Sequence, residues 1–118
     1  MTSPAGIYDL VADQGSTFSR RITWKDSTGT PINLTGYTAK MQVRETVDSS
    51  TVLLELSTTN SRITLGGAAG TIDLTASATV MTALAYGQFV YDLELTSAGG
   101  VVTRVVQGSF TVPGEVTR

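Results

Sequence analysis

The stretch from residue 37 to residue 43 most constrains the fold, because apolar and polar side chains alternate along it without a break. The apolar side chains occupy the odd positions: Tyr37, Ala39, Met41 and Val43. Successive side chains of a β-strand point to opposite faces, so this period of two predicts a strand with one buried face. The even positions, which include Lys40 and continue to Arg44, then face water or a neighbouring molecule.

Short strands separated by glycine, proline, asparagine and serine are expected along the whole chain. They are predicted over residues 6–13, 16–26, 37–45, 51–57, 62–65, 71–77, 88–96 and 101–112. Serine and threonine make up about a quarter of the sequence, and β-branched threonine suits the exposed face of a strand. One short helix is expected near residues 78–85, with Ser77 as its N-cap and Gly87 as its stop.

These elements predict an all-β protein with one domain over residues 1–118, built as an antiparallel two-sheet β-sandwich of the Ig-like or jelly-roll-like kind. A flattened barrel is the alternative. In the segment 16–26, Phe18, Ile22 and Trp24 share one face, with Arg20 among them. The termini, residues 1–6 and 113–118, have two interpretations: an N-terminal arm and a C-terminal tail that order against a partner, or simple frayed ends.

The segments 88–96 and 101–112 predict a hairpin with a defined register. A three-residue loop over residues 98–100 places Arg104 opposite Glu94, whereas a two-residue loop would place it on the core face, where a charge is costly. The inward side chains of the first strand are then Phe89, Tyr91, Leu93 and Leu95. The apolar parity changes after Val105, and Gly108 is the expected site of a β-bulge.

The charge balance and the N-terminal sequence argue against nucleic acid and membranes as partners. The chain carries 8 basic and 10 acidic residues, a net charge of −2, and has no basic patch of the kind that nucleic acid requires. The first ten residues lack the features of a signal peptide, and no segment is apolar enough to span a membrane. We therefore expect a soluble protein made in a cytoplasm, without nucleic acid or membrane as a partner.

No chemistry of catalysis, metal binding or cofactor binding is predicted. The sequence contains no histidine and no cysteine, which removes the usual serine-protease base and the commonest metal ligands. Asp92 and Glu94 share a face and could form a glycosidase pair, but a solvated pair opposite Arg104 is the favoured interpretation. Asp9 and Asp13 are interpreted as ordinary surface acids. The glycines of residues 66–70 are expected to form a strand connection, since no lysine follows them as in a phosphate loop.

Three segments, in this order, resemble a group of small bacteriophage and prophage virion structural proteins. They are QGSTFSRRITWKDSTGTPINLTGYTAKMQVR, GGAAGTIDLTAS and GQFVYDLELTSAGGVVTRVVQGSFTV, and they cover most of residues 14–112. The corner and strand LTGYTAKMQVR are also similar to the N-terminal β-sandwich domain of phage baseplate upper proteins. The resemblance implies a structural role in a virion, in which surfaces and not catalytic residues act.

Three alternatives for function remain, two from this structural role and one from a different class. The first is a non-enzymatic part of a tail, baseplate or neck, which binds other phage structural proteins and itself. The second is a capsid decoration protein that stabilises the head. The third is a carbohydrate-binding module in which Trp24 and Tyr37 form a sugar-stacking platform. The candidate partner contacts lie on the outward strand face and at both termini: Thr2, Pro4, Lys40, Arg44, Pro113, Glu115 and Arg118.

Overall fold

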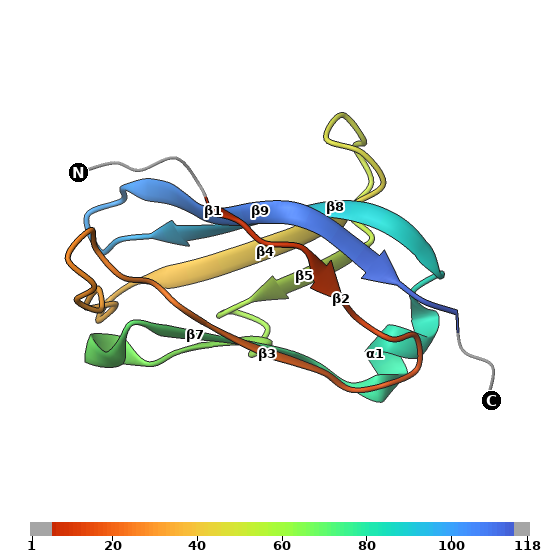
Figure 1. The fold of residues 1–118 in the computed structure, drawn as a ribbon, viewed down its shortest axis with the longest axis horizontal. Coiled ribbons are helices and arrows are strands. Elements are labelled where there is room, and N and C mark those ends of the chain that lie inside the picture. Colours follow the sequence, from red (N-terminus) through yellow and green to blue (C-terminus); the bar gives the residue numbers. More distant parts are fainter. Residues whose placement is uncertain (1–5, 115–118) are drawn as a thin grey trace.

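Two β-sheets pack face to face in the computed structural model, which describes residues 6–114 (Figure 1). The strands are β1 (Gly6–Ile7), β2 (Leu10–Val11), β3 (Phe18–Thr23), β4 (Thr38–Arg44), β5 (Leu54–Ser57), β6 (Ile63–Leu65), β7 (Thr71–Ala76), β8 (Gly87–Thr96) and β9 (Val102–Val112). One 3-10 turn, Gly67–Ala69, connects β6 to β7, and the helix α1 (Ala78–Ala83) connects β7 to β8. The predicted two-sheet β-sandwich with one short helix is confirmed.

The strand order defines the type of sandwich. The large sheet has the order β1-β9-β8-β4-β5, with β2 also paired to β9, and the small sheet has the order β3-β7-β6. Strands β9, β8 and β4 therefore occupy the places of G, F and C in an immunoglobulin-like sandwich, and β3, β7 and β6 those of B, E and D. The additional strand β5 beside β4 is the feature of the variable type.

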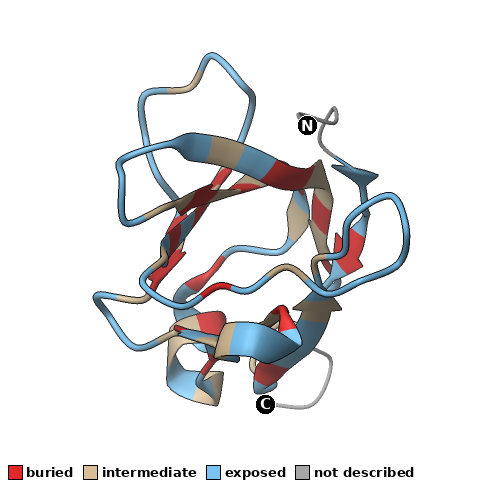
Figure 2. Cartoon of the chain, turned by 90° about the vertical axis from the view of Figure 1, so that its left-hand side faces the viewer, coloured by how far each residue is buried: buried red, intermediate tan, exposed pale blue. Residues whose placement is uncertain are grey.

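The core lies between the sheets and takes alternate residues from each strand, as Figure 2 shows by the inward position of the buried residues. The predicted buried face of the strand over residues 37–43 is confirmed: Met41 and Val43 are completely buried, Ala39 is 5% exposed, and Tyr37 packs against the core. The aromatic rings of Phe18 and Phe110, one from each sheet, meet edge to face with their centroids 5.6 Å apart. Alternation along the strands is thus what joins the two sheets.

The β8–β9 hairpin has the predicted register and loop. Glu94 pairs with Arg104, and the loop closes through the hydrogen bond from the Ser97 amide to the Val101 carbonyl, 2.9 Å. Gly100 has φ of 89°, the left-handed conformation that a three-residue loop needs. The four predicted inward side chains, Phe89, Tyr91, Leu93 and Leu95, are all buried.

The predicted position of the bulge is wrong. The register shifts between Leu93 and Glu94, which pair with Val106 and Arg104, so the extra residue is Val105 and not Gly108. Val105 and Val106 are both buried, 8% and 9% exposed. The bulge therefore lets two consecutive valines enter the core, which a regular strand would not allow.

The N-terminal segment also differs from the prediction of one antiparallel strand over 6–13. It forms two short strands that run parallel to β9, with Gly6 paired to Val106 and Leu10 paired to Phe110. Between them the chain leaves the ladder, and the Asp9 carboxylate accepts a hydrogen bond from the Ser109 amide, 3.0 Å. Asp9 is thus a structural residue of the sheet and not an ordinary surface acid.

At Gly108 the backbone of this N-terminal segment approaches the backbone of β9 closely. A Cβ atom at Gly108 would lie 2.6 Å from the Tyr8 carbonyl oxygen and 2.9 Å from Asp9 Oδ1. The buried hydroxyl of Tyr91, which pairs with Gly108 in the ladder, donates a hydrogen bond to the same Tyr8 carbonyl. A glycine is required here because two backbones approach closely. This close approach, and not a bulge, accounts for the glycine at position 108.

Strand β3 places Arg20 on the predicted face, where it pairs with the buried Leu74. Phe18 is buried and Ile22 is half-buried, but Arg20 is exposed. Its guanidinium lies 5.2 Å from the centre of the Phe18 ring and donates to the Val11 carbonyl, 2.6 Å. A charged side chain at the edge of the sandwich thus covers the core while keeping its head in water.

Helix α1 begins as predicted and ends earlier than predicted. The Ser77 hydroxyl accepts a hydrogen bond from the Val80 amide, 3.3 Å, and Met81 is fully buried. The C-cap is Leu84, and Gly87 is instead the first residue of β8.

Candidate functional site

The outward side chains of the large sheet form the most highly charged strand surface among the described residues, and we name it the large outer face. Cross-strand pairing sets its rows: Glu55, Gln42, Asp92 and Gln107 lie side by side, as do Ser57, Lys40, Glu94 and Arg104. Arg44, Val90 and Ser109 form a third row. Lys40 and Arg44, which the alternation predicted to face outward, both lie on this face.

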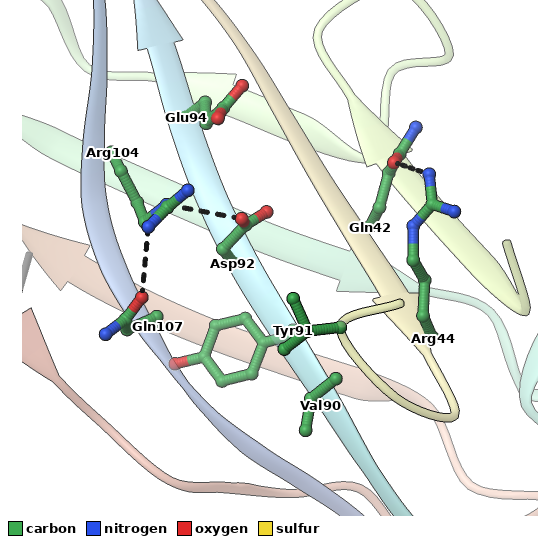
Figure 3. Close-up of a pocket in the computed structure, with 9 residues that line it drawn as sticks. Gln42, Arg44, Val90, Tyr91, Asp92, Glu94, Arg104 and Gln107 are labelled. Atoms are coloured by element: carbon green, nitrogen blue, oxygen red, sulfur yellow. Dashed lines mark hydrogen bonds and ion pairs between the residues drawn. The ribbon is translucent and has the colours of Figure 1, made fainter. Parts of the chain in front are cut away.

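A groove of about 520 Å³ runs over this face, between its strands and the connection from β4 to β5. It is lined by Gln42, Arg44, Val47, Val90, Tyr91, Asp92, Glu94, Arg104 and Gln107. Figure 3 shows the charged members spread along β4, β8 and β9 and not converging on a single point. The groove has the form of a contact surface that follows a sheet, with charges of both signs along it.

The β4 side of the groove is held by a chain of hydrogen bonds. Arg44 donates to the Gln42 side chain, 2.8 Å, and to the Ser49 carbonyl, 2.6 Å. Gln42 in turn donates to the Glu55 carboxylate, 2.8 Å. This network ties the β4–β5 connection to the sheet and leaves Val47 on it 83% exposed.

The β9 side is organised by Arg104. Its Nε atom lies 3.3 Å from Asp92 Oδ2, and its Nη1 atom donates to Gln107 Oε1 at 3.4 Å (Figure 3). The predicted pairing of Arg104 opposite Glu94 is correct in the ladder, but the ion pair forms diagonally with Asp92. Diagonal neighbours on a sheet are within reach of long side chains.

Lys40 and Glu94 are two charges at the centre of this face whose side chains form no ion pair or hydrogen bond within the described residues. They are direct cross-strand neighbours. Opposite charges on neighbouring strands attract. Both groups are therefore available to a partner that presents the complementary charge.

The outer face of the small sheet, which we name the small outer face, has a different chemistry. Its outward positions are mostly hydroxyl side chains: Ser19, Thr23, Thr64, Thr71 and Thr75. Its central pair is Arg21 and Asp73, joined by two hydrogen bonds of 2.7 and 3.1 Å. The hydrogen bond from Arg21 lowers the pKa of Asp73, and both charges are compensated within the chain.

The edge of the large sheet at β5 is closed by side chains. The Glu55 carbonyl accepts hydrogen bonds from Asn60 Nδ2, 3.0 Å, and Arg62 Nη1, 3.1 Å. The Ser57 amide donates to Asn60 Oδ1, 2.9 Å. These contacts occupy backbone groups that an added strand would need, so the face and not this edge offers room for a partner.

The remaining predicted contact residues lie elsewhere. Pro113 is exposed after β9, and its carbonyl accepts a hydrogen bond from the Gln14 amide, 3.2 Å. It follows the end of β9 that pairs with the start of β8, whereas Lys40 pairs with Glu94 near the end of β8. The structure therefore does not gather the predicted contacts into one site. The other predicted contacts, Thr2, Pro4, Glu115 and Arg118, lie outside the described residues.

The proposed sugar platform has an unfavourable shape. The rings of Trp24 and Tyr37 meet edge to face, with an interplanar angle of 82° and centroids 6.3 Å apart. Both side chains are only half exposed and pack against the core. Two rings at right angles do not present one flat surface to a sugar.

Two further findings concern metal ions and membranes. In the described part of the chain, no three acidic, histidine or cysteine side chains lie together as a metal site would need. No described helix has the length and apolar character that crossing a bilayer demands.

The glycines of 66–70 form the 3-10 turn between β6 and β7, so the predicted strand connection is confirmed.

Sequence reasoning missed some members of the large outer face. Gln42 and Gln107 complete its hydrogen-bonded rows, and Val47 lines its groove. The period of two carried the signal for Gln42, since it lies between Lys40 and Arg44. Nothing local could have indicated Gln107, because the bulge at Val105 decides which face it occupies.

No protein-family model matches the sequence, and no curated protein matches it. Among solved structures, the chain is similar to CopC from Methylosinus trichosporium OB3b, with 13% identity, a TM-score of 0.49 and coverage of 98% of this chain and 90% of that one. It is also similar to the extracellular domain of the voltage-gated sodium channel beta4 subunit, with 14% identity, a TM-score of 0.46 and 98% coverage of both chains.

Proposed function

We propose that this chain is a non-enzymatic structural protein of a bacteriophage virion, which forms part of the tail, baseplate or neck, or attaches to it, through protein–protein contacts. The large outer face carries the proposal. It combines an open groove with charges of both signs, two of which form no ion pair within the described residues, and it is built on strands whose inner side chains are buried in the core.

A surface of this kind suits permanent assembly. It is formed by three long neighbouring strands, so its side chains are held by the sheet and lose little conformational freedom when a partner binds. Its charges alternate in sign, which favours one partner and one orientation over others. The resemblance of the three sequence segments to virion proteins supplies the biological setting for that partner.

The experiment that tests this function is the location of the chain in particles. Phage particles of the genome that encodes it are purified and labelled with gold-conjugated antibodies against the chain, and the same particles are analysed by mass spectrometry. We expect labels at the tail, baseplate or neck. Labels over the head would favour the capsid decoration protein instead, and mature particles that lack the chain would refute both.

A glycan-binding assay distinguishes the carbohydrate-binding alternative from the structural role. We expect the purified chain to bind no glycan on an array. Glycan binding that is lost in a Trp24→Ala variant with an unchanged circular dichroism spectrum would contradict the structural role.

A further inference from the structure

We propose that the large outer face binds a second copy of this chain, related by a two-fold axis that runs parallel to the strands between β4 and β8. This inference deepens the proposed function, since it rests on the same surface and names its partner. The argument depends on which side chains lie opposite each other when two identical faces meet.

The cross-strand register supplies those positions. Lys40 on β4 pairs with Glu94 on β8, and one row further Gln42 pairs with Asp92. A two-fold axis parallel to the strands and between β4 and β8 places β4 of one copy over β8 of the other. Each Lys40 then faces Glu94 of the second copy, and each Gln42 faces Asp92 of the second copy.

This arrangement forms each favourable contact twice, as an isologous interface must. It pairs the two central charges that have no partner within the described chain, Lys40 and Glu94. Gln107 on β9 and Glu55 on β5 lie at the two ends of the Gln42 row, so the same axis brings these side chains opposite each other. No two like charges of the rows are opposed.

An axis at right angles to the strands gives the opposite result. It places the row that contains Asp92 over the row that contains Glu94, so that carboxylates of the two copies meet. Like charges that face each other across an interface cost free energy. The charge pattern therefore selects one of the two simple face-to-face orientations, in which the strands of both copies run in the same direction. Packed sheets commonly align their strands within about 30° of each other.

The apolar side chains of the groove fit the same axis. Val47 stands on the β4 side of the groove and is 83% exposed, and Val90 lies on β8 in the row of Arg44. Superposing β4 on β8 of the second copy brings Val47 toward Val90 of that copy. An aliphatic contact at one end and paired charges at the centre would fix the register of the two copies.

Charge reversal tests the inference on the full chain by sedimentation equilibrium at concentrations up to about 1 mM. The wild-type chain is expected to form a dimer that weakens as salt is added. Lys40→Glu opposes two pairs of carboxylates and Glu94→Lys opposes two pairs of ammonium groups, so each variant is expected to lose at least about tenfold in affinity. An equimolar mixture of the two variants should recover a dimer, because position 40 of each copy then faces the opposite charge at position 94 of the other.

The control is Lys25→Glu, which makes the same change of charge at an exposed residue outside the large outer face. It should leave the dimer unchanged. Circular dichroism melts of all variants check that the fold is retained. A wild-type chain that stays monomeric overturns the inference, and so does a dimer that neither reversal weakens or a mixture that stays monomeric.

The inference and the proposed function fail in different experiments. A monomeric chain that is found in the tails of particles would refute self-association and leave the structural role standing. A dimer with the expected charge dependence that is absent from particles would refute the structural role and leave the contact standing.

Discussion

The two sheets follow the same rule on their inner faces and differ on their outer faces. Both bury alternate side chains in one shared core. The small outer face consists of hydroxyl side chains around one ion pair, Arg21 and Asp73, whereas the large outer face has a groove and two charges, Lys40 and Glu94, that form no ion pair within the described residues. The fold requires only the inner pattern, so the outer side chains are free to differ between the two sheets. This difference is the basis for the proposal that the large outer face binds a partner.

The edges of the sheets differ in the same sense. The chain extends the large sheet with its own N-terminal segment along β9, and Asn60 and Arg62 close the other edge at β5. The small sheet receives no such extra strand within the described residues. Four predictions test this contrast, from the largest effect on stability to the smallest.

The strongest test is Gly108→Val, which breaks the attachment of the N-terminal segment to the large sheet. The new Cβ would lie 2.6 Å from the Tyr8 carbonyl oxygen, so β1 and β2 must move away from β9. We expect a loss of about 2 to 3 kcal/mol in the free energy of unfolding by urea, with faster amide exchange in β1 and β2 than in β7.

The matched control is Gly99→Val in the β8–β9 loop. A Cβ there would meet only the Ser97 hydroxyl, at 3.9 Å. Its effect should stay within about 0.5 kcal/mol. Equal losses in the two variants would mean that the close approach at Gly108 does not hold the edge.

A weaker test is Tyr91→Phe, which removes the hydroxyl that bonds the N-terminal segment to the large sheet. Loss of this hydrogen bond to the Tyr8 carbonyl should cost about 1 kcal/mol. Tyr37→Phe is the control, since no hydrogen bond of the Tyr37 hydroxyl occurs within the described residues. Similar melting temperatures for the two variants would contradict the prediction.

The same residue gives a pH dependence with a defined sign. Burial raises the pKa of the Tyr91 hydroxyl above its ordinary value, so the unfolded chain releases this proton first. The stability that the neutral hydroxyl supports is complete below about pH 10, the pKa of a tyrosine in an unfolded chain, and falls as pH rises further. Spectrophotometric titration should show one tyrosine that ionises only on unfolding, and Tyr91→Phe should remove it.

Smaller effects are expected on the outer faces, where Asp73→Asn tests the compensated pair of the small outer face. The Arg21 guanidinium lowers the pKa of Asp73, so the pair stabilises the fold above about pH 3.9, the unfolded value, and its contribution is lost as pH falls toward the lowered value. The urea midpoint of the variant should lie below that of wild type at pH 7 and approach it as pH falls below about 3.9.

Asp92→Asn provides the comparison on the large outer face. Its partner Arg104 makes a single contact of 3.3 Å, and the Asp92 and Arg104 side chains are 40% and 50% exposed. We expect a smaller change in the midpoint at pH 7 than for Asp73→Asn. A larger change would contradict the view that the Asp92–Arg104 pair is weaker than the Asp73–Arg21 pair.

The parts of the fold that depend on neighbouring residues could be predicted from the sequence. The period of two placed Met41 and Val43 in the core, and the glycines of the loop set Arg104 opposite Glu94. The same period placed Lys40 on the large outer face, between the buried Ala39 and Met41, and Arg44 on the same face after the buried Val43.

The parts that depend on distant segments could not be predicted. Gly108 is explained by Tyr8, which lies at the other end of the sequence and meets β9 only in the folded chain. The bulge at Val105 arises because the core accepts two consecutive valines. Arg20 shares the inner face with Phe18 and Ile22, and its exposed guanidinium donates to the Val11 carbonyl at the edge of the sandwich. Each of these contacts joins residues that no local pattern relates.

The parallel pairing of β1 and β2 with β9 has a consequence for biosynthesis. Each residue of these two strands pairs with the residue 100 positions later, as Gly6 does with Val106 and Leu10 with Phe110. A ribosome therefore has to synthesise β9 before β1 and β2 can find their place. Such a long-range closure is slow to form, so the nascent chain exposes Leu10 until β9 has left the ribosome, and β1 and β2 dock only after the strands between them and β9 have been made.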